Sequence, residues 1–283
     1  MKGLQAIMSR IQKRLGTTFE NMSPREYEQF FVDDLNKQVG NENEKDGYNC
    51  NVCKNKAWVV KLVENPDGTY GKEYGDCKCV KARKSIMRLK RSGLANNISD
   101  CTFDKYEATE PWQKAMKSAA TDYAKNPVGW LFFGGQSGCG KTHLCVGVCW
   151  ELLLDGKEVV YMMWRDDIAK IKGFATEPEQ RQALIDRFKT AEVLYIDDLF
   201  KTGRNPDGSE PKPTSADINA AFEIINYRYN NPALLTIISS ELNEDDLLDI
   251  DEAVGGRIFE RSKSISIAKD RSRNYRIRKA VTL

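Results

Sequence analysis

Residues 131–144 read LFFGGQSGCGKTHL, a glycine-rich loop between an apolar run and the beginning of an expected helix. Residues 135–142 within it match the pattern GxxxxGK followed by Ser or Thr. In such a loop, glycines let backbone N–H groups face a phosphate chain, the lysine neutralises phosphate oxygens and the hydroxyl binds Mg²⁺. We expect ATP and Mg²⁺ to bind here; the alternative is a degenerate loop without nucleotide. The expected nucleotide-binding residues are Gly135, Gln136, Ser137, Gly138, Cys139, Gly140, Lys141, Thr142 and His143.

The loop also contains a cysteine and the only histidine of the chain. Cys139 and His143 lie about one helical turn apart, and a helix N-terminus favours a thiolate, so a nucleophilic cysteine is an alternative. We favour packing roles for both, because position 139 belongs to the variable part of the motif. A single histidine also excludes a mixed Cys/His zinc site elsewhere and leaves little scope for a Ser-His-Asp triad.

Length and composition predict two domains and a cytoplasmic location. The chain has 283 residues, 41% of them hydrophobic, which is enough for a sizeable core. Its 43 basic and 41 acidic residues give a formal net charge of +2, so a nucleic-acid surface would have to be a local patch. No segment approaches the roughly 18 uninterrupted apolar residues of a membrane helix, and no signal-peptide core is evident.

From residue 126 onward, apolar strand-like runs alternate with helical patterns. The strand-like runs are VGWLFFG, EVVYMMW, EVLYIDDL, LLTIISS and KSISIAK. This alternation predicts an α/β domain, namely a doubly wound, largely parallel sheet. Residues 201–214 have the composition of an exposed, flexible loop.

One of these strands ends in two acids, about 55 residues after the phosphate loop. Asp197 fits the carboxylate that orders the Mg²⁺ water shell, and Asp198 fits the base that polarises an attacking water. Acids at strand ends can also be structural. The intact phosphate loop at this spacing favours the catalytic interpretation, with Lys141 as a further catalytic residue.

Taken in order, the motifs resemble those of the AAA+ ATPases, and among them the helicase loaders of the DnaC and DnaI type, with the IstB-type transposition helpers as relatives. The resemblance covers about residues 100–281. Its motifs are CTFDKYEA, GGQSGCGKTHL, IDDLF, SADINAAFEIINYRYNN, TIISSEL, GGRIFERS and NYRIRK. It implies a P-loop AAA+ domain that hydrolyses ATP and self-associates.

The resemblance also implies roles for two arginines. In the family, the arginine of the GGRIFERS position reaches the nucleotide of the neighbouring subunit; here it is Arg257. An arginine after the last strand, here Arg276, contacts the nucleotide of its own subunit or its neighbour. A surface or salt-bridge role is the alternative for Arg257, while Arg271, Arg273 and Arg278 are equally placed as phosphate or DNA contacts.

The sequence departs from the AAA+ pattern in two places. Ser240 and Glu241 stand where many members have an asparagine that senses the γ-phosphate, so sensing is expected to be weak or to depend on Ser240. The chain ends soon after the last expected strand, which predicts a module without a full helical lid, as in the loaders, and weak stand-alone ATPase activity.

The N-terminal region is expected to contain two helices, a linker and a hairpin. The second helix should begin at Pro24, within a capping box formed by residues 23–26. Residues 40–47 have the composition of a linker. The runs AWVVKLVE and TYGKEYGD flank the turn at 65–68 and predict a β-hairpin. The apolar face of the first helix would consist of Leu4, Ile7, Met8, Ile11 and Leu15.

Two cysteine pairs, Cys50 with Cys53 and Cys77 with Cys79, flank this hairpin. Because each pair can supply two ligands from one turn, we predict an all-thiolate tetrahedral Zn²⁺ site. Free cysteines or a redox pair are the alternatives. Since burial alone would hardly hold so small a module together, its folding should depend on the metal.

Residues 78–91 follow this module with seven Lys and Arg residues and no acid. They form either a solvated helix face, with Ile86, Met87 and Leu89 turned inward, or a contact for a phosphate backbone or an acidic partner. In loaders of the DnaI type, which this arrangement resembles, a zinc-bearing N-terminal module binds the replicative helicase.

We therefore predict a helicase loader with two parts. Residues 1–95 would dock on a hexameric replicative DNA helicase, and residues 96–283 would form an ATPase domain that self-associates and binds single-stranded DNA. The alternatives are a transposition-helper ATPase that binds DNA and a transposase, a P-loop small-molecule kinase, or a binding module with a vestigial ATP site. The cysteine hairpin argues against the first, and the absence of recognisable lid arginines and an acceptor pocket argues against the second.

Overall fold

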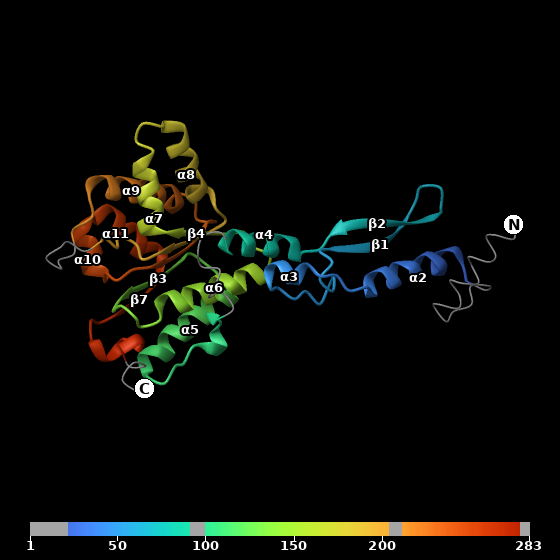
Figure 1. Ribbon diagram of the computed structural model, residues 1–283, viewed down its shortest axis with the longest axis horizontal. Coiled ribbons are helices and arrows are strands. Elements are labelled where there is room, and N and C mark those ends of the chain that lie inside the picture. The colour runs from blue at the N-terminus through green and yellow to red at the C-terminus, as the bar shows by residue number, and fades with distance from the viewer. Residues whose placement is uncertain (1–21, 91–99, 204–210, 278–283) are drawn as a thin grey trace. The chain divides into compact units, whose positions relative to one another are not determined.

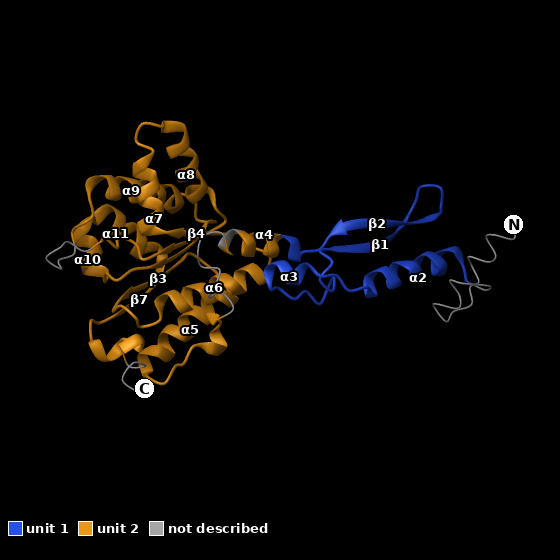
Figure 2. Cartoon of the chain, in the orientation of Figure 1, with its two compact units in different colours: residues 1–80 blue, residues 81–283 orange. Residues whose placement is uncertain are grey.

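The computed structural model describes residues 22–90, 100–203 and 211–277. The chain divides into two compact units, Met1–Val80 and Lys81–Leu283 (Figure 2). The expected first helix lies outside the described residues. So does the expected boundary between docking and ATPase parts near residue 95, which stays a prediction.

The first unit contains a helix, a short helix and a hairpin. Helix α2 spans Pro24–Lys37 and begins with the expected capping box, in which Ser23 and Glu26 bond to each other's backbone N–H. Strands β1 (Trp58–Glu64) and β2 (Tyr70–Asp76) pair antiparallel, as predicted. The segment predicted as a linker instead forms the short helix α3, Glu42–Asp46, because Gly47 can end it in the left-handed conformation at φ 79°.

Helix α2 is fixed to the hairpin through one side chain. The amide of Asn36 donates to the carbonyl of Val60 at 2.8 Å and accepts from its N–H at 3.0 Å. The side chain therefore pairs with strand β1 as a neighbouring strand would, and it satisfies backbone groups that an edge strand otherwise leaves open.

Helix α4, Cys79–Leu89, begins at the last of the paired cysteines. Lys81 and Lys84 are exposed, and Ile86 is buried as expected. The expectation that Met87 turns inward is wrong, because its side chain is 37% exposed. The side chain of Leu89 lies outside the described residues.

The second unit is built on five parallel strands in the order β4-β5-β6-β3-β7 (Figure 1). This confirms the predicted sheet. The strands are β3 (Trp130–Gly135), β4 (Val159–Met163), β5 (Val193–Asp197), β6 (Leu235–Ser239) and β7 (Ser262–Ile267). Each of the five predicted runs forms a strand. Four of them are apolar along most of their length, as buried parallel strands are, while the edge strand β7 alternates polar and apolar residues.

Helices cover both faces of the sheet (Figure 1). Helices α5 (Pro111–Lys125) and α6 (Lys141–Leu154) lie on one face. The other helices with their bounds are α7 (Trp164–Gly173), α8 (Pro178–Thr190), α9 (Ser215–Tyr229), α10 (Glu244–Ile250) and α11 (Glu252–Arg261). Of these, α7, α9 and α11 lie over the opposite face, which completes a three-layer domain. No helix among the described residues is long and apolar enough to cross a membrane.

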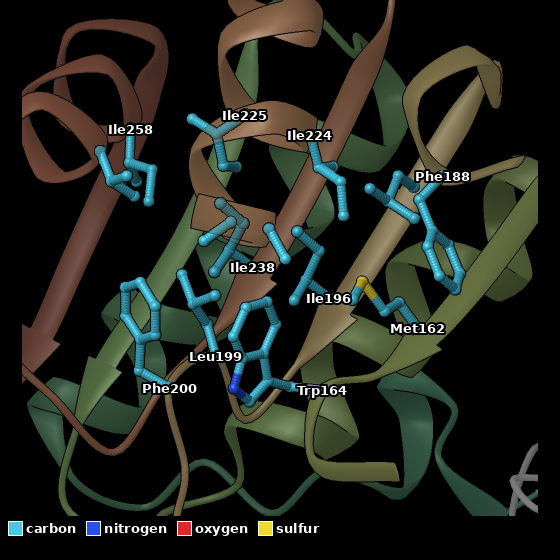
Figure 3. Close-up of a cluster of buried hydrophobic side chains, with 14 of the residues drawn as sticks. Met162, Trp164, Phe188, Ile196, Leu199, Phe200, Ile224, Ile225, Ile238 and Ile258 are labelled. Carbon is cyan, nitrogen blue, oxygen red and sulfur yellow. The ribbon is translucent and has the colours of Figure 1, made fainter. Parts of the chain in front are cut away.

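A buried cluster joins the sheet to the helices of the α9 side (Figure 3). Met162, Ile196 and Ile238 come from neighbouring strands, and Ile224 and Ile258 from the covering helices. Full burial of such a side chain stabilises the fold by about 1.5–3 kcal/mol. The cluster therefore holds rigid the strand ends from which the candidate site is built.

Candidate nucleotide site and cysteine cluster

The phosphate loop links β3 to α6 and depends on glycine. Gly135, Gly138 and Gly140 have φ values of 92°, 73° and 96°, a region that side chains rarely adopt. At Gly135 a Cβ would also collide with the carbonyl of Ile267 on β7. The sequence can therefore form this loop only with glycine here.

Lys141 is buried at the first position of α6. Its ammonium donates to the carbonyls of Gly135 and Gln136, both at 2.8 Å. These bonds hold the charge inside the loop, where an incoming phosphate could replace the carbonyl oxygens as acceptor.

Thr142 and Asp197 lie together, as expected for two residues that hold one Mg²⁺. The Thr142 hydroxyl donates to Oδ1 of Asp197 at 3.0 Å. Asp197 is buried at the carboxyl end of β5 and therefore faces the beginning of α6. A hydroxyl beside a carboxylate is an oxygen donor set that suits Mg²⁺, which is bound in many nucleotide sites through a few protein oxygens and the phosphates.

Three further hydroxyls bond to the Asp197 carboxylate, and the sequence analysis missed them. Tyr161 on β4 donates to Oδ2 at 2.9 Å, while Tyr195 and Ser239 donate to Oδ1 at 2.5 and 2.6 Å. Tyr195 could have been found, because residues two apart in a strand share a face. Tyr161 could not, since its position depends on the pairing of β4 with β5.

Asp198 follows in a turn with a positive φ of 56° and makes an ion pair with Lys201 at 2.7 Å. Lys201 also pairs with Glu241, at 2.9 Å. Burial raises the pKa of Asp198, although the bond from Lys201 opposes this. Burial would also raise the pKa of Glu241, but bonds from Lys201 and Ser137 outweigh it and the pKa is lowered. Lys201 belongs to none of the motifs in the sequence.

These groups surround one cavity of about 380 Å³. It is lined by the phosphate loop from Ser137 to His143, by Asp198, Lys201 and Glu241, and on other sides by Cys101, Tyr106, Tyr275 and Arg276. The structure thus brings the phosphate loop and the second strand-end acid to one concave site, the usual form of a small-molecule site.

Cys139 and His143 are both packed in this wall. Burial raises the pKa of the Cys139 thiol, which argues against a nucleophilic role. His143 Nε2 lies 2.9 Å from the Thr102 carbonyl oxygen, and its ring makes an edge contact with Tyr106.

The two candidate arginines occupy different places. Arg276 lines the cavity, whereas Arg271 and Arg273 do not line it and Arg278 lies outside the described residues. Arg257 is on α11, away from the cavity lining; its Nε donates to Asn226 at 3.0 Å. A site completed by Arg257 would therefore have to belong to another copy of the chain.

The two candidate sensing residues also differ. The Ser240 hydroxyl is fully buried and donates to the carbonyl of Leu199 at 2.8 Å, so it does not face the cavity. Glu241 lines the cavity directly.

In the first unit, the four paired cysteines form one buried cluster. Their sulfur atoms all lie within 4.8 Å of one another, with Cys50–Cys77 at 3.8 Å and Cys53–Cys79 at 3.6 Å. Zn–S bonds of about 2.3 Å in a tetrahedron place sulfur atoms about 3.8 Å apart. The cluster therefore fits Zn²⁺ and is too open for disulfide bonds.

Backbone groups favour thiolate at this cluster. Burial by itself raises the pKa of Cys53, but bonds from the Ala57 N–H and from neighbouring thiols outweigh it and lower the pKa to about 7. Burial raises the pKa of Cys77. Zn²⁺ binds cysteines as thiolates, so binding at this cluster would release their protons.

No protein-family model matches this sequence. The chain is 31% identical over 225 residues to the uncharacterized protein YqaM of Bacillus subtilis, covering 74% of this chain and 67% of that protein. It is 31% identical over 234 residues to the phage-like element PBSX protein XkdC of B. subtilis, covering 77% and 81%. It is 28% identical over 123 residues to the replicative helicase loader DnaC of Escherichia coli, covering 42% of this chain and half of DnaC.

The crystal structure of the DnaC helicase loader superposes with a TM-score of 0.52, at 22% identity, over 61% of this chain and 99% of that one. The strand order, the phosphate loop and the acids at the end of β5 define a P-loop AAA+ protein. Within that class, the chain belongs to one family with YqaM and XkdC, and it is a homologue of the replicative helicase loader DnaC, whose crystal structure shares its fold.

Proposed function

We propose that this protein is an ATP-dependent loader that places a hexameric replicative DNA helicase on single-stranded DNA. The observation that carries the proposal is the convergence of Thr142, Asp197 and Asp198 on the phosphate loop, within a chain related to DnaC. Relatedness supports a role in replication, and the site supports nucleotide chemistry. We place this activity in the cytoplasm.

In the proposed reaction, ATP lies along residues 135–142 with its phosphates against Lys141. Thr142 and Asp197 would hold Mg²⁺, which would supply positive charge to neutralise the phosphates. Asp198 orients the attacking water and accepts its proton.

Two arginines would complete the charge balance. Arg276 lines the cavity of its own subunit, while Arg257 would enter the site of a neighbour. A guanidinium at the γ-phosphate stabilises the transition state, and one supplied in trans makes hydrolysis depend on assembly. We infer slow turnover that acts as a release switch.

Residues 1–95 would bind the helicase, and the zinc site would hold the first unit folded. Lys81 and Lys84 on α4 are exposed, and the segment from Lys78 to Lys90 contains no acid. This basic surface supports contact with DNA phosphates or with an acidic face of the helicase.

A binding experiment tests the partner. A tagged hexameric replicative helicase from the same source should retain the full chain on a column with ATP and Mg²⁺. It should retain the Lys141→Ala variant more weakly. A helicase that retains neither protein, under conditions where the chain is folded, would refute the loader proposal.

A further inference from the structure

Lys201 lines the nucleotide cavity together with Lys105 and Lys141, and no motif assigns it a role. Its ammonium lies between two carboxylates, 2.7 Å from Asp198 Oδ2 and 2.9 Å from Glu241 Oε1. All three side chains line the cavity together with Ser137 and Lys141 of the phosphate loop.

The turn that carries Lys201 is firmly fixed. Asp198 and Phe200 have positive φ values of 56° and 61°, which non-glycine residues adopt only when their surroundings enforce it. Here the Leu199 N–H donates to the Ser239 carbonyl at 2.8 Å, and the buried Phe200 ring packs edge-on against Trp164. The backbone of Lys201 is therefore set by β6 and the core.

Asp198, Lys201 and Glu241 lie where a γ-phosphate would be expected, beside the residues that would hold Mg²⁺. Thr142 and Asp197, the expected Mg²⁺ pair, adjoin Asp198, and Glu241 lines the same cavity as Ser137 of the phosphate loop. A terminal phosphate here would meet two carboxylates. In a partly buried site, the negative phosphate and the two carboxylates would repel one another strongly unless a cation lies between them.

We propose that Lys201 determines the preference of this site for nucleoside triphosphate over diphosphate. Its ammonium neutralises Asp198 and Glu241 and is close enough to donate to a γ-phosphate oxygen that arrives beside them. A diphosphate ends before this point and does not need that charge. The inference rests on the proposed nucleotide binding and adds the residue that selects the γ-phosphate.

The test measures binding of a non-hydrolysable ATP analogue and of ADP, each with Mg²⁺, to the full-length protein. Lys201→Met should weaken the analogue about tenfold and ADP less than about twofold. Lys201→Arg should retain most of the preference. In the double variant Lys201→Met with Glu241→Gln, removal of the unpaired carboxylate should recover most of the lost affinity for the analogue.

Lys157→Met is the matched control. Lys157 is also half-exposed and ion-paired, to Glu192 at 3.3 Å, but it does not line the cavity. This variant should leave both affinities unchanged.

Equal weakening of both nucleotides by Lys201→Met, or no weakening of either, would overturn the inference. So would a double variant no better than Lys201→Met. If the unmodified chain binds neither nucleotide, the proposed function itself fails, and that result is distinct from a loss of discrimination.

Discussion

The Thr142 hydroxyl donates to the carboxylate of Asp197 over 3.0 Å, although 55 residues separate them in the chain. This bond joins the phosphate loop to the acid strand, because β3 and β5 end at the same edge of the parallel sheet. Four hydroxyls in all donate to that carboxylate, which holds it in one orientation. The nucleotide site is thus organised before any ligand arrives.

The orientation of Asp197 should be measurable through Mg²⁺. Tyr161→Phe removes the donor to Oδ2 and should raise the Mg²⁺ concentration for half-maximal ATP hydrolysis about tenfold, as outer-shell changes at metal sites do. Tyr123→Phe is the control, since Tyr123 is also buried but donates to Gly129. An unchanged Mg²⁺ dependence in Tyr161→Phe would show that this bond does not orient the carboxylate.

Substitutions of Lys141 and of Arg257 should affect different steps of ATP hydrolysis. Lys141→Ala should abolish ATP binding, whereas Arg257→Ala should spare binding and slow hydrolysis about a thousandfold, because a trans arginine acts on the transition state. Mixing the two variants should restore part of the rate, since one subunit keeps the loop and its neighbour supplies Arg257. Loss of binding in both variants, or no recovery on mixing, contradicts a trans role.

The pH dependence of hydrolysis should report Asp198. Burial raises its pKa above the ordinary value, so the base becomes protonated, and the rate falls, at a higher pH than for an exposed aspartate. The bond from Lys201 lowers this pKa, and Lys201→Met should therefore move the acidic limb to still higher pH. Single-turnover rates measured between pH 4 and 8 at saturating ATP give both profiles. The reference is the pKa of an exposed aspartate, which is about 4. If the acidic limb does not move in Lys201→Met, the group that limits the rate is not an Asp198 whose pKa is lowered by Lys201.

Metal removal should unfold only the first unit. The protein should contain one equivalent of zinc per chain, and a strong chelator should abolish protection of the β1–β2 backbone in hydrogen exchange, since structural zinc supplies about 10–16 kcal/mol in small modules. Cys50→Ser and Cys79→Ser should lose the metal. Cys101→Ser, outside the cluster, should retain it. Full zinc content in Cys50→Ser would contradict the four-thiolate site.

The sequence predicted what depends on local pattern. Four of the strands were recognisable as apolar runs and β7 by its alternation of serine with isoleucine, and the phosphate loop was recognisable because only glycine readily adopts its backbone. Asp197 followed from its place at a strand end. The helix at 42–46 was missed, since its composition is that of a linker and its end depends on Gly47.

Other parts of the site depend on contacts between distant segments. Tyr161 reaches Asp197 only through the register of β4 on β5, and Lys201 reaches Glu241 only because β6 fixes the turn after β5. No local pattern encodes either contact. The proposed role of Arg257 depends on a second copy of the chain, so neither the sequence nor one chain displays its target.

The most direct test of the loader proposal is a helicase-loading assay on closed circles of single-stranded DNA. The hexameric helicase, the full chain, ATP and Mg²⁺ are combined, and helicase bound to the circles is separated from free helicase by gel filtration. The proposal predicts that the chain greatly increases circle-bound helicase and that Lys141→Ala does not. The same amount of bound helicase with and without the chain would contradict it.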